Sequence, residues 1–256
     1  MFARTYLAWC HAELGTFPEG RAFGDEGLQI AEAVAHPASL MYGYWGIGLL
    51  SLRQGDLRRA LPLLEQAMGS CQEADRPNFF SVVAATLGAA YTLDGRVADA
   101  VPLLTQAMAQ STARETVVLQ ALCGLSLGEA QMQTSRLEEA QVLAEQTLVH
   151  VRAHQERGNE AYALRLLGDI AARREPLESD QAGEYYRQAI ALAGELGMRP
   201  LVAHCHLGLG TLYGRMGRAG PCRTCRRHRI VPRHGHDLLA APGGSRAGRS
   251  GRLLEI

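Results

Sequence analysis

The chain has 256 residues, and 47% of them are hydrophobic, which is enough for a continuous core. The formal net charge is zero and all 26 basic residues are arginine, so the chain cannot form the lysine-containing phosphate-binding loop of P-loop NTPases. No signal peptide is apparent at the start, and the most apolar window, residues 40–52, is too short to span a bilayer. We therefore expect a cytoplasmic protein, with its cysteines reduced and serving as small core residues.

Two positions that hold only glycine or alanine recur through the chain. The first occurs once in every predicted first helix, at Ala8, Gly48, Gly88, Gly128, Gly168 and Gly210. The second follows in the predicted second helix, at Gly20, Ala60, Ala100, Ala140 and Ala182. A period of about 40 residues in helix-pair units is typical of an α-solenoid. The fifth pair has two extra residues, which we place in the turn formed by residues 173–180.

The residue types around these positions have a physical explanation. Helices that cross closely need glycine or alanine at the crossing point, because a larger side chain would separate their axes. A large apolar residue precedes each first position and is expected in the core: Leu7, Ile47, Leu87, Leu127, Leu167 and Leu209. Glycines at 15, 55, 95 and 217 predict left-handed helix ends, and Pro62 and Pro102 are expected in the first turn of their helices.

The predicted fold is therefore all-α: a right-handed α-α superhelix of five antiparallel helix pairs and one further first helix, over residues 1–217. The pattern resembles the tetratricopeptide repeat, in which a large apolar residue precedes a small one and an aromatic residue follows three positions later, as Tyr91 and Tyr213 do here. The departures are the longer period and the glycines Gly20, Gly24 and Gly27, which weaken the first repeat.

Repeats of this length resemble the C-terminal arms of bacterial signalling ATPases and nucleotide-cyclase-linked regulators, and the segment 195–210 is similar to the last first-helix unit of the cyclase-linked arms. The resemblance implies a protein–protein interaction scaffold, acting as the sensor or regulatory arm of a larger signalling ATPase or adenylate/guanylate cyclase. The NTPase or cyclase module would then be encoded upstream. A truncated gene fragment without a present role is a further alternative.

Residues 218–256 form a basic tail that we expect to be disordered. Residues 1–214 carry 16 arginines against 24 acidic residues, whereas residues 215–256 carry 10 against 2. The next small position is due at 222, but Cys222 stands there and the helical period stops. The sequence that follows is rich in Arg, His and Gly, a composition expected of GC-rich DNA translated in a shifted frame. Resequencing the gene around codon 218 tests this interpretation. The alternative is a stand-alone zinc- or nucleic-acid-binding protein that uses the tail, with Cys222, Cys225 and His228 as zinc ligands.

The concave face lined by the first helices is the candidate functional surface. Its register predicts a groove for a protein or peptide, formed by Tyr42, Trp45, Leu49, Leu52, Arg53, Leu125, Glu129, Met132, Arg165 and Asp169. The alternative is that a tightly wound superhelix buries these side chains against its own neighbours. No nucleophile, base and orienting acid cluster at a fixed spacing, so we predict no enzyme activity, no cofactor and no metal site. Membrane and nucleic-acid partners are not expected.

Overall fold

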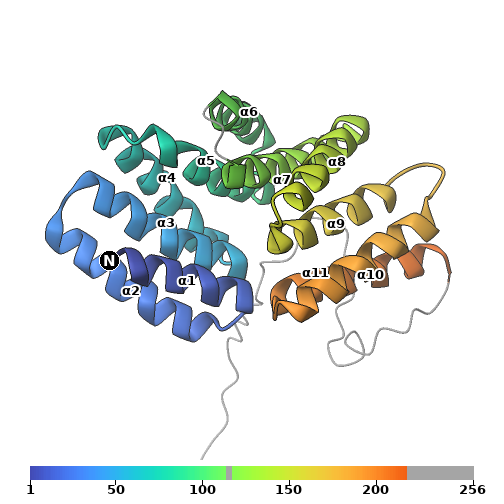
Figure 1. Ribbon diagram of the computed structural model, residues 1–256, viewed down its shortest axis with the longest axis horizontal. Helices are drawn as coiled ribbons and strands as arrows, with labels where there is room; N and C mark the ends of the chain where they lie inside the picture. The colour runs from blue at the N-terminus through green and yellow to red at the C-terminus, as the bar shows by residue number, and fades with distance from the viewer. Residues whose placement is uncertain (114–116, 218–256) are drawn as a thin grey trace, which may run out of the picture. The chain divides into compact units, whose positions relative to one another are not determined.

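The structure is a computed structural model that describes residues 1–113 and 117–217. These residues form eleven α-helices and contain no strand. The helices are α1 (Phe2–Leu14), α2 (Phe17–Val34), α3 (Pro37–Gln54), α4 (Leu57–Glu73), α5 (Pro77–Leu93), α6 (Val97–Ala113), α7 (Val117–Gln133), α8 (Leu137–Ala153), α9 (Arg157–Ala171), α10 (Ser179–Glu195) and α11 (Arg199–Arg215). They form five successive pairs, from α1–α2 to α9–α10, followed by α11 (Figure 1). The predicted all-α repeat architecture is confirmed.

Local signals in the sequence set the helix ends. Asp56 caps α4 by accepting a hydrogen bond from the Arg59 backbone N–H at 3.2 Å. Pro37 and Pro77 occupy the first helical positions of α3 and α5, where a missing N–H has little effect. The turn glycines have left-handed backbones, at Gly15, Gly55, Gly95 and Gly217. Ser135 takes the same conformation, with φ of 61°, in the fourth pair.

The small positions lie where two helices cross. A Cβ added at Gly48 would stand 2.7 Å from Leu64 Cδ2, and one at Gly88 would stand 2.5 Å from Leu104 Cγ. The second positions Ala60, Ala100, Ala140 and Ala182 are all fully buried. The crossings therefore require the residues that the repeat supplies.

Three details differ from the sequence-based expectations. Pro62 and Pro102 lie inside α4 and α6 and not in their first turns; both are exposed, so water can solvate the carbonyl left without a helical donor. Leu7 is 37% exposed. Its counterpart Leu127 in α7 packs on the second helix of the preceding pair, α6, and no such helix precedes α1 among the described residues.

The glycines of the second helix do not interrupt it. α2 is a regular helix of 18 residues that contains Gly20, Gly24 and Gly27. Its neighbours explain them: a Cβ added at Gly20 would stand 2.8 Å from Leu50 Cδ1, and one at Gly24 would stand 2.9 Å from Ile47 Cγ1. Gly20 and Gly24 therefore let α2 approach α3 closely, whereas Gly27 faces α1, where a Cβ would stand 3.1 Å from Arg4 Cβ.

No helix in the described part of the chain is long and apolar enough to cross a membrane. The interpretation of residues 218–256, including the frame shift, the disorder and the Cys222, Cys225 and His228 zinc site, falls outside the described residues.

Candidate functional site

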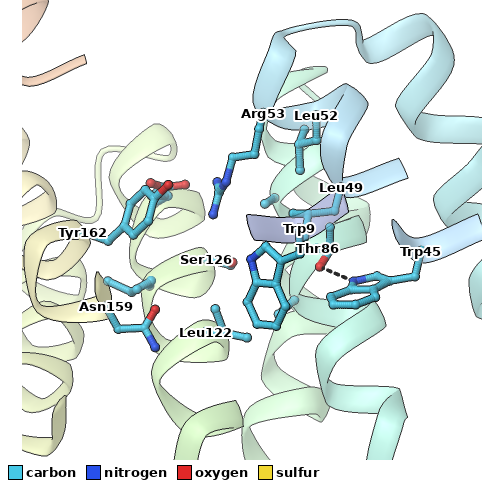
Figure 2. Close-up of a pocket in the computed structure, with 14 residues that line it drawn as sticks. Trp9, Trp45, Leu49, Leu52, Arg53, Thr86, Leu122, Ser126, Asn159 and Tyr162 are labelled. Carbon is cyan, nitrogen blue, oxygen red and sulfur yellow. Dashed lines mark hydrogen bonds between the residues drawn. The ribbon is translucent and has the colours of Figure 1, made fainter. Parts of the chain in front are cut away.

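The first helices of the repeats lie side by side and form one common face. α1 packs on α3, α3 on α5, α5 on α7, and α7 on α9. Side chains from all five helices line a cavity of about 60 Å³ (Figure 2). Its apolar lining consists of Trp9, Trp45, Leu49, Leu52, Leu122 and Leu125, with Ala85 and Ala89. Its polar lining consists of Arg53, Thr86, Ser126, Glu129, Asn159 and Tyr162.

Two tryptophans form the aromatic wall of the cavity, and they are the only two in the chain. Their rings meet edge to face with centroids 5.4 Å apart. The Trp45 indole donates from Nε1 to Thr86 Oγ1 at 3.0 Å, and Thr86 donates in turn to the Val82 carbonyl at 2.9 Å. Trp45 is 5% exposed, so its position is fixed by both packing and hydrogen bonding.

One carboxylate joins the first repeat to the second and the fifth. Glu13 Oε1 accepts hydrogen bonds from Arg53 Nε at 3.0 Å and from Trp9 Nε1 at 3.3 Å. Glu13 Oε2 accepts a hydrogen bond from the Tyr162 hydroxyl at 2.6 Å. The Arg53 guanidinium also lies over the Tyr162 ring, 4.7 Å from its centroid. Helices far apart in sequence, α1, α3 and α9, therefore meet at this carboxylate.

Burial and charge keep these donors protonated. Burial raises the pKa of Tyr162, and the adjacent Glu13 carboxylate raises it further against the opposing effect of Arg53. For Arg53, burial acts to lower the pKa, but Tyr162 and Glu13 outweigh it and the pKa is raised. Both groups thus act as hydrogen-bond donors to Glu13.

A second charged group lies beside the cavity on α7, α9 and α10. Arg165 pairs with Glu129, and with Asp169 at 2.5 Å. The Tyr186 hydroxyl donates to the other oxygen of Asp169 at 2.6 Å. Burial acts to lower the pKa of Arg165, but Asp169 and Glu129 outweigh it and the pKa is raised. The side chains of all three ionised residues are less than a third exposed, so the pairs operate in a partly desolvated environment.

The structure brings six of the ten predicted groove residues into the cavity wall: Trp45, Leu49, Leu52, Arg53, Leu125 and Glu129. The other four lie outside that wall: Tyr42, Met132, Arg165 and Asp169. The six apolar and aromatic members of the ten are buried, and the four charged ones are half-buried and paired. Their role in binding a partner stays a prediction.

The sequence reasoning missed Trp9, Glu13 and Tyr162. The repeat register contains a signal for each of them. Trp9 lies one repeat before Leu49, Glu13 lies one repeat before Arg53, and Tyr162 lies three repeats after Tyr42. Applying the register to the first repeat would have placed two of them on the concave face. Within the described residues, no group of three or more His, Cys, Asp or Glu side chains is arranged to hold a metal ion.

The fold and its concave cavity define a helical-repeat solenoid of the tetratricopeptide type. No family model matches the sequence, and no curated protein matches it. Among solved structures, a Rap protein complexed with competence and sporulation factor aligns with a TM-score of 0.65 and 15% identity, over 80% of this chain and 59% of that one. This chain thus spans somewhat more than half the length of the Rap protein.

Two further solved structures share the fold. BtubC from P. vanneervenii aligns with a TM-score of 0.57 and 18% identity, over 91% of this chain and 98% of that one. A signal transduction ATPase with a tetratricopeptide repeat sensor, from Pyrococcus horikoshii, aligns with a TM-score of 0.54 and 15% identity, over 84% of this chain and 33% of that one. At these identities the similarity concerns the fold.

Proposed function

We propose that the chain is a protein-interaction arm that captures a peptide segment of a partner at the cavity of the first helices, and that it does so as the sensor or regulatory arm of a larger signalling ATPase or cyclase. The observation that carries the proposal is the cavity itself, which five repeats line with both apolar and charged groups. Such a combination anchors an apolar side chain and orients the polar groups around it.

The size of the cavity limits what enters it. An α-helix has a diameter of about 10–12 Å with its side chains, which a cavity of about 60 Å³ does not admit. A single side chain of an extended peptide is of suitable size, and the half-buried residues Leu122, Ser126 and Asn159 at the cavity are positioned to contact the flanking backbone. The solved Rap protein in complex with competence and sporulation factor has the same fold, which supports a ligand-binding role for a solenoid of this kind.

The two tryptophans provide the assay. Because both line the cavity, intrinsic fluorescence of the native chain reports its occupation directly. Peptides selected from a random decapeptide library on the native chain should shift this emission and bind with micromolar affinity.

A cavity-filling variant provides the specificity test. Ala89→Leu adds volume inside the cavity, whereas Ala109→Leu makes the same change at an exposed position of α6. The selected peptides should bind Ala89→Leu at least about tenfold more weakly and Ala109→Leu unchanged. Equal affinity for both variants would show that the peptides bind elsewhere. The link to a signalling ATPase is tested separately, by reading the upstream DNA for an in-frame NTPase or cyclase module.

A further inference from the structure

The Glu13 carboxylate is held as a bound ligand would be. Its two oxygens accept hydrogen bonds from Trp9 Nε1, Arg53 Nε and the Tyr162 hydroxyl, at 3.3, 3.0 and 2.6 Å. Two of these donors come from other repeats, on α3 and α9, and they converge on one point at the edge of the cavity. A cationic donor and a hydroxyl directed at a shared acceptor are the elements of a carboxylate-binding site.

Arg53 still has hydrogen-bonding capacity at this point. It donates to Glu13 through Nε, and among the described residues its two terminal Nη atoms have no hydrogen-bond partner. Figure 2 shows Arg53 and Tyr162 together at the cavity, with the Trp9 indole close to them. Because a guanidinium has five N–H donors, a ligand carboxylate can engage Arg53 more fully than Glu13 does.

We propose that Glu13 is an internal stand-in for a partner's carboxylate, and that the ligand of this site is a peptide in which a carboxylate lies next to an apolar side chain. The carboxylate takes the place of Glu13 on Arg53 and Tyr162, and the apolar side chain enters the cavity beside the tryptophans. This inference rests on the proposed peptide-binding function and specifies its partner.

The exchange preserves the charge balance of the site. Arg53 and Arg165 face three carboxylates, those of Glu13, Glu129 and Asp169, and Arg165 holds the last two. A cationic ligand group would meet the guanidinium of Arg53 at this point. A neutral one would leave Arg53 without a salt bridge when Glu13 leaves, because Glu129, the other carboxylate that acts on Arg53, is paired with Arg165. A carboxylate replaces a carboxylate, so no buried charge is left uncompensated.

Glu13 can leave without movement of its helix. Glu13 is the penultimate residue of α1, and its side chain is 20% exposed to solvent. α1 is held independently, because Arg199 on α11 donates from Nε to the Leu14 carbonyl at 2.9 Å and from Nη2 to the Gly15 carbonyl at 3.3 Å. A change of rotamer at Glu13 is therefore sufficient to open the site.

The test compares a small acid with its amide. N-acetyl-leucine carries a carboxylate beside an apolar side chain, and N-acetyl-leucinamide lacks the charge. Their binding to the full chain is measured by tryptophan fluorescence and by isothermal titration calorimetry. Glu13→Gln removes the internal competitor, Glu13→Asp withdraws it by one methylene, and Glu19→Gln is the matched control on the exposed side of α2.

Glu13→Gln and Glu13→Asp should each bind N-acetyl-leucine about tenfold more tightly than the Glu19→Gln control, because charge-assisted hydrogen bonds become available to the ligand. The amide should show no such gain, and adding Arg53→Gln to Glu13→Gln should abolish the gain. Thermal unfolding verifies that each variant is folded. If Glu13→Gln does not fold, the comparison uses Glu13→Asp.

Three outcomes overturn the inference. They are equal affinity of the acid for the Glu13 variants and the control, an equal gain for the amide, and no binding of the acid up to its solubility limit. Peptides selected on the native chain that bind through the cavity but have no acidic group would refute the carboxylate site and leave the proposed function intact. Failure of the selection itself would instead count against the proposed function.

Discussion

Replacing Gly88 should overpack the crossing of α5 and α6. A Cβ at this position would stand 2.5, 2.6 and 2.9 Å from Leu104 Cγ, Cδ2 and Cδ1, closer than carbon atoms normally approach. Leu104 is fully buried and cannot swing away into solvent. Gly69 in α4 is the matched control, because a Cβ there would have no atom within 4 Å.

The magnitude follows from two opposing effects. Alanine in a helix interior is favoured over glycine by about 1 kcal/mol, and this gain applies at both positions. Overpacking at Gly88 costs about 1–3 kcal/mol. Gly69→Ala should therefore stabilise the chain by up to about 1 kcal/mol, and Gly88→Ala should be neutral or destabilising by up to about 2 kcal/mol. The leucine variants should differ further in the same direction.

Urea unfolding, monitored by both circular dichroism and tryptophan fluorescence, measures the difference in stability between the Gly88 and Gly69 variants. The two unfolding curves of each variant must coincide, because long repeat arrays can unfold in parts. A double-mutant cycle then identifies the cause. Leu104→Ala makes room for the new side chain, so Gly88→Ala should cost less in that background by about 1–3 kcal/mol. Equal urea midpoints for the Gly88 and Gly69 variants, or a cycle without coupling, would refute the assigned crossing point.

Three other changes have definite expected results. Trp45→Ala should destabilise the chain by about 3–5 kcal/mol and lower its thermal midpoint, because the indole is buried and bonded to Thr86; an unchanged midpoint would mean that the indole is not part of the core. Tyr186→Phe should cost about 1–3 kcal/mol in urea unfolding by removing the hydrogen bond to Asp169, and unchanged stability would contradict that bond. In a variant without the two tail cysteines, Cys222 and Cys225, a thiol reagent at pH 8 should label only Cys10 before the chain unfolds. The other three cysteines, Cys71, Cys123 and Cys205, are buried, and burial raises the pKa of each thiol. If mass spectrometry shows stoichiometric labelling of more than one thiol, this packing is wrong.

The repeat architecture could be predicted because it depends on local patterns. Glycine and alanine at fixed spacing determine where two neighbouring helices cross, and the crossings at Gly48 and Gly88 lie where the register placed them. The same register placed Trp45 and Leu125 on the concave face. Neither prediction required knowledge of how distant repeats meet.

The charged edge of the cavity could not be predicted in this way. Glu13 and Tyr162 are 149 residues apart, and their contact depends on the accumulated curvature of all the repeats between them. A small rotation per repeat, which no single residue specifies, decides whether the first repeat reaches the fifth. The left-handed residues Ala35, Asp75 and Gln155 between pairs were also missed, because none of them is glycine.

The irregular fifth repeat is connected to this charged edge through Tyr186. In the second and third pairs, a leucine of the second helix faces the glycine of the first: Leu64 faces Gly48, and Leu104 faces Gly88. In the fifth pair, the two extra residues between α9 and α10 place Tyr186 opposite the glycine of the first helix, Gly168. Ring atoms of Tyr186 would stand 3.0 Å from a Cβ added at Gly168 and 2.6 Å from a Cβ added at Gly208 in α11. The larger ring thus fills two glycine positions, and its hydroxyl reaches Asp169, which leucine cannot do. Asp169 in turn pairs with Arg165, which also pairs with Glu129 in the cavity wall. The longer turn and the glycine in α11 therefore act together, and through Tyr186 and Asp169 they position the arginine that pairs with Glu129 in the cavity wall.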